Sequence, residues 1–195
     1  MIYRFKIYKK MIYDDIKKLT KQDREEIFEF AMKRSREILT GTMEGNMTNR
    51  PTFEQIYMEF AENISRRSTC ERLHVGAVIT TTDFRKVIGL GYNGNATGFK
   101  NSCDRPEESG NCGCLHAEDN AVINCNVDRD TKKIFFVTHL PCPTCAKRII
   151  NLGNVVKVIF KNDYRRKDSI FMFNKIGIEV YQIDNDGNMT VRFNN

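Results

Sequence analysis

Two short motifs in the sequence contain the residue types that bind a transition metal. The first is H-A-E at residues 116–118, and the second is P-C-P-T-C at residues 141–145. His116, Cys142 and Cys145 would offer one imidazole and two thiolates to a tetrahedral ion and leave its fourth position open. Three protein ligands with an open position are typical of catalytic zinc, whereas structural zinc normally has four. The spacing therefore predicts a catalytic zinc site.

Glu118 is positioned in the sequence to transfer protons at such a site. It lies two residues beyond the predicted ligand His116, near a zinc-bound water but not bound to the metal. Zinc lowers the pKa of its water from about 15.7 to roughly 7, which makes hydroxide available as the nucleophile. Glu118 is predicted to take the proton of that water and pass it to a ring nitrogen and then to a departing amine. H-x-E followed by P-C-x-x-C is the established signature of zinc deaminases that act on nucleobases.

Both motifs are expected at the N-termini of helices. His116 opens a helix predicted over residues 116–125, and P-C-P-T-C follows a strand predicted over 133–139 and opens a helix over 143–152. The positive dipole end of a helix favours thiolate over thiol, and so favours metal binding. Two helices that start at the same edge of a sheet can bring the three ligands together.

The remaining elements suggest the sheet that holds these helices. A capping-box pattern predicts a helix over 53–67, and two β-branched runs at 74–80 and 86–93 predict a hairpin. Residues 95–114 form a loop with almost no apolar periodicity. The alternating order that follows argues for a partly parallel sheet covered by helices, an α/β sandwich. Its later elements are strand 155–161, helix 168–176, strand 178–183 and a last strand at 188–193.

Length and composition predict a folded domain with an N-terminal extension. The chain has 195 residues, of which 41% are hydrophobic and 29% charged, the balance of an ordinary globular protein. Helical periodicity over 14–39 and a Gly- and Asn-rich segment before Pro51 predict a helical extension over 1–50 and a main domain over 51–195. No apolar run approaches about 18 residues, and the N-terminus does not read as a signal peptide. We therefore expect a cytoplasmic protein without a membrane partner.

Charge and cysteine content add less specific information. The net charge of +6 fits an anionic substrate, a nucleic acid or neither. For the cluster Arg165, Arg166 and Lys167, a solvated surface and a binding role are equal alternatives. Seven cysteines in a chain without a secretory signal favour metal binding or catalysis over disulfides.

With these residues identified, the chain resembles the deoxycytidylate (dCMP) deaminases over about residues 52–183. The resemblance implies a three-layer α/β/α sandwich with a central mixed five-stranded sheet. It also implies zinc-dependent hydrolysis of dCMP to dUMP with release of ammonia, in pyrimidine deoxynucleotide metabolism, by a homo-oligomer that we expect to be a hexamer. The matching stretches are RSTC (67–70), VGAV (75–78), GYNG (91–94), HAE (116–118), PCPTC (141–145) and Asp163-Tyr164.

The same resemblance implies a set of substrate contacts. Asn93 would contact the deoxyribose, the backbone at Ala117 the pyrimidine carbonyl, and Tyr164 would pack near the nucleotide. Arg67 is our choice for the 5′-phosphate, since a planar guanidinium matches phosphate geometry. The alternatives are that Arg67 is a surface arginine at a helix end and that Asn93 is a turn residue.

Family members often carry a proline soon after GYNG, where this chain reads Gly94-Asn95-Ala96-Thr97-Gly98. That loop is associated in many members with control by dCTP and dTTP, so the resemblance implies these effectors, bound with Mg²⁺. The missing proline leaves such regulation open in this chain.

A second group of cysteines would fill a structural zinc site. Four thiolates complete a tetrahedral site, and the apolar-poor loop at 95–114 needs a clamp. His74 or Asp104 could replace one thiolate. The alternative is that some of them are free buried cysteines, which behave as small apolar residues and which Cys125 fits well. The four predicted ligands are Cys70, Cys103, Cys112 and Cys114.

The alternative small-molecule substrates are a modified dCMP and another cytosine nucleotide or nucleoside. Two other functions compete with the deamination of a mononucleotide. A polynucleotide cytosine or adenosine deaminase acting on tRNA or single-stranded DNA has only the basic charge in its favour, because Trp is absent and no basic and aromatic stripe flanks the motifs. A non-catalytic zinc-binding module would have no need of Glu118 beside an open metal position.

Overall fold

The computed structural model describes residues 20, 50–108 and 110–193. The chain divides into two compact units, residues 1–50 and 51–195. The helical extension predicted for residues 1–50 lies outside the described residues, apart from Thr20 and Arg50. Within the described part, no helix combines the length and apolarity needed to cross a membrane. The elements in chain order are α3 (Phe53–Ser65), β1 (Gly76–Thr81), β2 (Val87–Tyr92), α4 (Ala117–Ile123), β3 (Lys133–His139), α5 (Pro143–Leu152), β4 (Val155–Asn162), α6 (Asp168–Lys175), β5 (Glu179–Ile183) and β6 (Met189–Val191).

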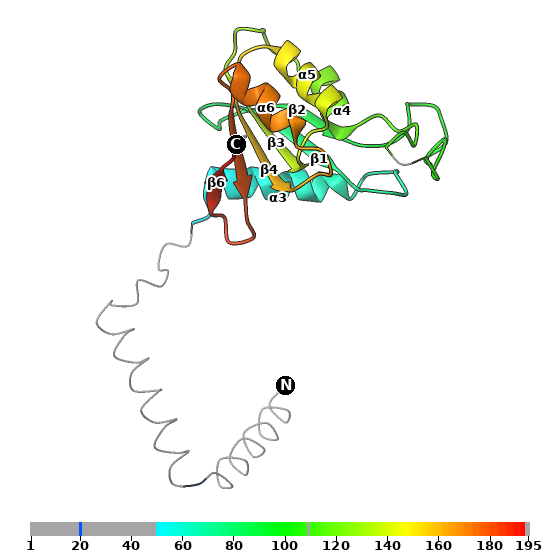
Figure 1. Cartoon of the computed structure of the whole chain (residues 1–195), viewed down its shortest axis with the longest axis horizontal. Coiled ribbons are helices and arrows are strands. Elements are labelled where there is room, and N and C mark those ends of the chain that lie inside the picture. The colour runs from blue at the N-terminus through cyan, green and yellow to red at the C-terminus, as the bar shows by residue number, and fades with distance from the viewer. Residues whose placement is uncertain (1–19, 21–49, 109, 194–195) are drawn as a thin grey trace, which may run out of the picture. The chain divides into compact units, whose positions relative to one another are not determined.

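The strands form one mixed sheet in the order β2-β1-β3-β4-β5-β6 (Figure 1). The pairs β3-β4 and β4-β5 are parallel, and the other three pairs are antiparallel. The sheet thus has six strands, so the implied five-stranded sheet was wrong by one edge strand. The sixth forms because Asp184 Oδ1 accepts hydrogen bonds from the N–H groups of Asp186 and Asn188, which folds the chain back against β5.

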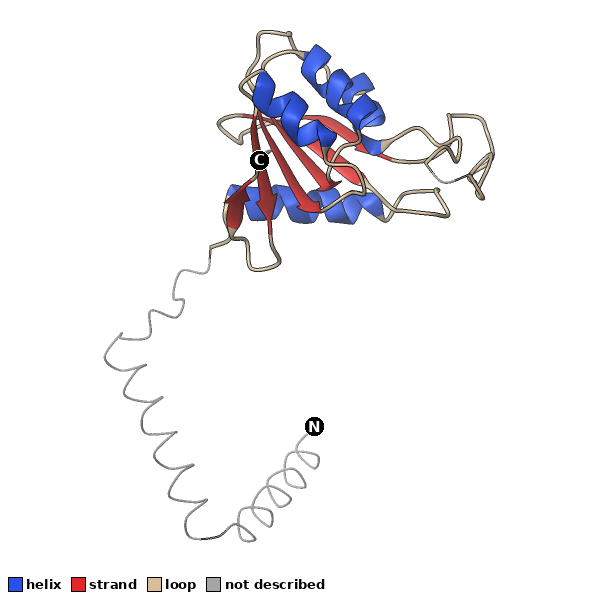
Figure 2. Ribbon diagram, viewed as in Figure 1, coloured by secondary structure: helices blue, strands red, loops and turns tan. Residues whose placement is uncertain are grey.

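Helices cover both faces of this sheet, as Figure 2 shows, with α3 on one face and α4, α5 and α6 on the other. Alternate residues of β3 supply the two cores. Phe135 and Val137 pack on the side of α4, α5 and α6, whereas Ile134 and Phe136 pack with Met58 of α3. This confirms the predicted three-layer α/β/α sandwich, because a strand buried on both faces must be covered on both sides.

The helix starts are set by local sequence signals. Thr52 and Gln55 form the predicted capping box at the start of α3. His116 is the N-cap residue of α4, and Cys142 is the N-cap residue of α5, with Pro143 at its first position. The position of α4 depends on Gly91 in β2, because a Cβ there would lie 2.2 Å from the Ala117 carbonyl oxygen. Both metal motifs therefore begin helices that pack directly on the sheet or on each other.

Candidate active site and metal centres

The first candidate site lies where β3 and β4 end and α4 and α5 begin. His116 Nδ1 is 3.2 Å from Cys145 Sγ and 3.7 Å from Cys142 Sγ. The ligand atoms of all three residues lie within 4.8 Å of one another. Ligands bound tetrahedrally at 2.0–2.3 Å from zinc lie roughly 3.5 Å apart. The three predicted ligands are therefore brought together with a spacing that fits zinc.

The ionisable groups of this site shift one another's pKa values strongly. Hydrogen bonding with Cys145 lowers the pKa of Cys142 to about 3, against the effect of burial. Hydrogen bonding with Cys142 raises the pKa of His116 to about 9, while the bond to Cys142 and burial together raise the pKa of Cys145. Without a metal the site thus contains a thiolate and an imidazolium. Binding of a metal must displace the protons of His116 and Cys145, so its affinity depends on pH.

Glu118 lies beside these ligands but is not one of them. It is 4% exposed and lines the same cavity, whose volume is about 440 Å³, as His116 and Cys142. Burial raises its pKa to about 7, with the charge of His116 opposing that shift. A carboxyl group with such a pKa can accept and return a proton near neutral pH.

Three of the four predicted substrate contacts line this cavity. They are Asn93, Ala117 and Tyr164, whereas the exposed Arg67 is not among the lining residues. The Asn93 side chain also has a structural role, because Oδ1 accepts a hydrogen bond from the Val75 N–H at 2.8 Å and Nδ2 donates to the Leu73 carbonyl at 2.6 Å.

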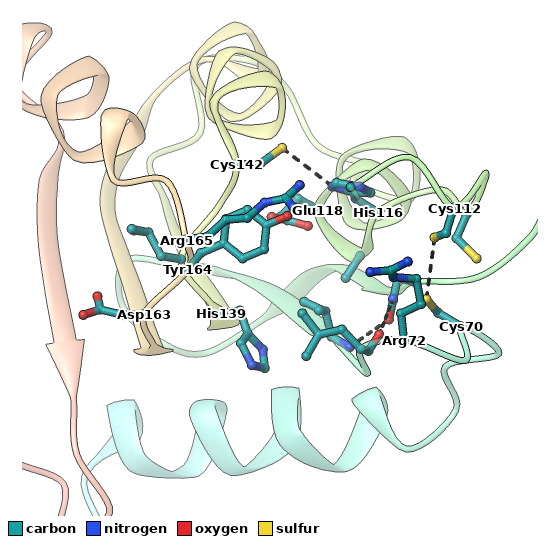
Figure 3. A pocket seen from close by; sticks show the side chains of 17 residues that line it. Cys70, Arg72, Cys112, His116, Glu118, His139, Cys142, Asp163, Tyr164 and Arg165 are labelled. Atoms are coloured by element: carbon teal, nitrogen blue, oxygen red, sulfur yellow. Dashed lines mark hydrogen bonds between the residues drawn. The ribbon is translucent and has the colours of Figure 1, made fainter. Parts of the chain in front are cut away.

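Two arginines outside the predicted substrate contacts also line the cavity, and one of them, Arg165, belongs to the basic cluster at 165–167. Figure 3 shows Arg72 on the side where Cys70 and Cys112 lie, and Arg165 beside Tyr164. Arg72 Nη1 donates to the Pro106 carbonyl at 2.6 Å, and the Arg165 guanidinium lies 5.4 Å from the centre of the Tyr164 ring. Their positions in the sequence could have indicated this role, because each arginine lies within two residues of a motif shared with the resembled family. Arg72 follows RSTC (67–70), and Arg165 follows Asp163-Tyr164. His139 and Asp163, at the ends of β3 and β4, also line the cavity.

The second cysteine group forms a compact cluster in loops. The four sulfur atoms lie within 4.8 Å of one another, with Sγ–Sγ distances of 3.8 Å for Cys70–Cys112, 3.6 Å for Cys70–Cys103 and 3.6 Å for Cys103–Cys114. All four are free thiols. Neither proposed substitute belongs to the cluster, and Asp104 instead accepts a hydrogen bond from Asn95 at 2.8 Å. Cys125 lies apart and packs against the core, as predicted.

The two clusters face the same cavity. Cys70, Cys112 and Cys114 are lining residues together with His116 and Glu118. Gly110, from the same loop, approaches Arg165 so closely that a Cβ there would lie 1.8 Å from Nη2 of that arginine. The loop at 95–114, together with Cys70, is therefore one wall of the candidate active site.

A mixed sheet between helix layers, with an H-x-E and a C-x-x-C motif meeting at its strand ends, defines a protein of the zinc-deaminase class. Residues 51–162 match the family model described as the cytidine and deoxycytidylate deaminase zinc-binding region. The chain belongs to this family.

Several known proteins are similar to this chain. ComE operon protein 2 of Bacillus subtilis is 34% identical over 151 residues, which cover 70% of this chain and 74% of that protein. The deoxycytidylate deaminase of Schizosaccharomyces pombe is 32% identical over 127 residues, which cover 59% of this chain and only 38% of that enzyme. The crystal structure of dCMP deaminase from the cyanophage S-TIM5, in complex with dCMP and dUMP, has 34% identity and a TM-score of 0.62 and covers 69% of this chain and 98% of that one.

Proposed function

We propose that this chain is a zinc-dependent hydrolase that converts dCMP to dUMP and releases ammonia. The observation that carries the proposal is the buried Glu118 carboxyl, which lines one cavity with His116 and Cys142, two members of a cluster of three candidate metal ligands. A non-catalytic metal site has no use for a buried acid whose pKa is raised to about 7. The named activities of the yeast and cyanophage relatives support deoxycytidylate as the substrate.

The chemistry divides between the metal and the protein. His116, Cys142 and Cys145 would hold the zinc ion, which when bound would supply a Lewis acid that makes water nucleophilic at neutral pH. Glu118 takes a proton from the attacking water and delivers it to the ring nitrogen next to the amino-bearing carbon. A carbon–oxygen bond forms, the carbon–nitrogen bond breaks, and Glu118 transfers the second proton of the water to the departing ammonia. The N–H of Ala117, in the first turn of α4, is a donor for the pyrimidine carbonyl.

The lining of the cavity favours a phosphorylated substrate. Arg72 and Arg165 place two guanidinium groups on the cavity wall, and each guanidinium carries five N–H donors in a planar fork. We propose that these two arginines bind the 5′-phosphate, and that Tyr164, which supports Arg165, packs near the nucleotide. Arg67 remains the prediction from sequence and is the competing choice.

We further propose that the four-cysteine cluster binds a second, structural zinc ion. Its sulfur spacing of 3.6–3.8 Å is close to the edge of a zinc tetrahedron, and four thiolates leave no open position. Burial raises the pKa of Cys103 and of Cys114, so the cluster without metal carries less charge than four thiolates would. Metal would hold the loop that forms the cavity wall.

The oligomer and the dCTP and dTTP effectors with Mg²⁺ remain predictions from the resemblance. A second cavity of about 900 Å³ is lined by β2, α4 and the loop at 94–101. Among its described lining residues there is no lysine or arginine, so these residues alone offer no cation to a triphosphate. Size-exclusion chromatography and kinetics with each nucleotide, with and without Mg²⁺, test both predictions.

A substrate panel tests the proposed reaction. Purified zinc-loaded protein should release ammonia from dCMP and not from cytosine, tRNA or single-stranded DNA. The same preparation should contain two zinc ions per chain, one of which is lost in the His116→Ala variant. Turnover of single-stranded DNA or tRNA in preference to dCMP would contradict the proposal.

Three arginine variants test the phosphate contacts. Arg72→Ala and Arg165→Ala should each raise KM for dCMP about tenfold to a hundredfold, the usual effect of losing a charged hydrogen bond. Turnover of deoxycytidine should change little, because it has no phosphate. Arg67→Ala is the matched control and should behave like the unmodified chain. If only Arg67→Ala were impaired, Arg67 would be the residue that binds the 5′-phosphate, as predicted from the sequence.

A further inference from the structure

The residues of the proposed zinc site come from two different helices. α4 supplies His116 at its N-cap and Glu118, whereas α5 supplies Cys142 at its N-cap and Cys145. These helices are short, with seven and ten residues. Zinc–ligand distances vary by only about 0.2 Å between good sites. The separation of the two helices must therefore be held closely for the site to form.

An ion pair between the buried Asp119 carboxylate and the half-exposed Arg148 guanidinium joins these same two helices. Asp119, in the first turn of α4, has a side chain that is only 10% exposed. Both of its carboxylate oxygens accept a hydrogen bond from Arg148 Nη1 of α5, at 2.5 Å. Among the salt bridges of the described residues in the main domain, it alone connects one helix to another.

The opposite side of α4 is fixed to the sheet. Asn120 Nδ2 donates to the Tyr92 carbonyl at 2.8 Å, and Asn124 Nδ2 donates to the Leu90 carbonyl at 2.9 Å. The consecutive residues Glu118, Asp119 and Asn120 thus face three different partners, namely the cavity, α5 and β2. With α4 hydrogen-bonded to β2, the Asp119–Arg148 pair is the salt bridge, among the described residues, that links α4 to α5.

We propose that Asp119 and Arg148 are positioning residues that hold α4 and α5 at the separation required for zinc binding. Neither residue lines the cavity, so neither contacts the substrate. The pair acts through His116 and Glu118 on one helix and through Cys142 and Cys145 on the other. This inference depends on the proposed zinc site but not on the identity of the substrate.

Zinc affinity is the measurement that separates positioning from simple stabilisation. Full-length, zinc-loaded Asp119→Ala, Arg148→Ala and the double variant would be titrated with a chelator, and His116→Ala would define the metal count of a chain without this site. Each single variant should bind the catalytic zinc about tenfold more weakly, in the range seen for residues that orient metal ligands. The double variant should bind the catalytic zinc no more weakly than either single variant, because the two residues act as a unit.

Conservative and control variants complete the test. Arg148→Lys keeps the charge and should recover part of the affinity, and it also serves if Arg148→Ala fails to fold. Arg85→Ala removes a member of an exposed ion pair in the β1–β2 turn and should leave zinc affinity unchanged. Variants that melt earlier but bind zinc as tightly as the unmodified chain would overturn the inference. If the variants bind zinc more weakly but the unmodified, zinc-loaded chain does not turn over dCMP, the result would support the inference and contradict the proposed substrate.

Discussion

The two cysteine clusters of this chain are built on different kinds of scaffold. His116, Cys142 and Cys145 begin helices that pack against the sheet, and the residues behind them, such as Ala117 and Ala146, are fully buried. The four-cysteine cluster joins Cys70 to a loop that has little apolar material of its own, in which Phe99 is 68% exposed. A hydrophobic core can hold three ligands in place and leave one metal position open for chemistry. A loop without a core needs a complete set of ligands to hold its own shape.

Removing one ligand from each cluster should give the largest contrast. His116→Ala should lower deamination by at least about a thousandfold, because the metal supplies several kcal/mol of catalysis. The core of the domain should keep its melting temperature. Cys114→Ser should instead expose the loop at 95–114 to limited proteolysis and raise KM for dCMP. Cys125→Ser is the control for both variants. If Cys114→Ser lost as much activity as His116→Ala and its loop stayed resistant to proteolysis, the two clusters would not differ in their roles.

Replacing the carboxyl group that only the first cluster possesses should separate chemistry from metal binding. Glu118→Gln should lower kcat about 10²–10⁴-fold, the usual contribution of a general acid–base group. Its zinc content should equal that of the unmodified chain, since Glu118 is not a metal ligand. Metal analysis and steady-state kinetics on the same preparation make this test. Full activity in a variant with normal zinc content would exclude Glu118 as the proton carrier.

The same substitution should stabilise the protein without metal at high pH. Burial raises the pKa of Glu118 from 4.5 to about 7, so the folded chain retains a proton that the unfolded chain has lost. Stability should therefore fall as pH rises from about 4.5 to 7, by about 3 kcal/mol from this group. Urea unfolding of chelator-treated protein should show Glu118→Gln to be more stable than the unmodified chain at pH 8 and equal to it at pH 4. Parallel pH profiles for both proteins would contradict the raised pKa.

Thiol reactivity should distinguish the clusters by a smaller effect. In the chain without metal, the pKa of Cys142 is lowered to about 3, whereas burial raises the pKa of Cys114. Thiolates are the reactive form, so iodoacetamide at pH 6.5 should modify Cys142 at least about tenfold faster than Cys114. Peptide mass spectrometry against time measures both rates together. Bound zinc should protect Cys142 from modification. Faster modification of Cys114 than of Cys142 would contradict the lowered pKa of Cys142 and the raised pKa of Cys114.

Much of the fold could be predicted because its signals are local. The capping box of α3, the hairpin β1–β2 and the alternation of strands and helices after residue 116 each depend on neighbouring residues. The boundaries were less accurate, since α4 ends at Ile123 rather than near residue 125. Lys133 shows a further limit. A lysine at the start of a strand gives no sign of burial, yet it is fully buried and its Nζ donates to four backbone carbonyls, including those of Thr131 and Gly153.

The sequence by itself predicted the three candidate metal ligands, the acid near them and the grouping of Cys70, Cys103, Cys112 and Cys114, and the structure brings each group together. These residue types and spacings have few alternative uses. Only the tertiary structure decided which arginines reach the cavity. Arg72 and Arg165 are far apart in sequence, yet both line the cavity with Glu118. Both also lie against the loop at 95–114, where Arg72 donates to the Pro106 carbonyl and Arg165 closely approaches Gly110. The ion pair between Asp119 and Arg148 is likewise a contact between two helices, which no local pattern encodes. Contacts of this kind depend on how elements pack, and packing is a property of the folded chain.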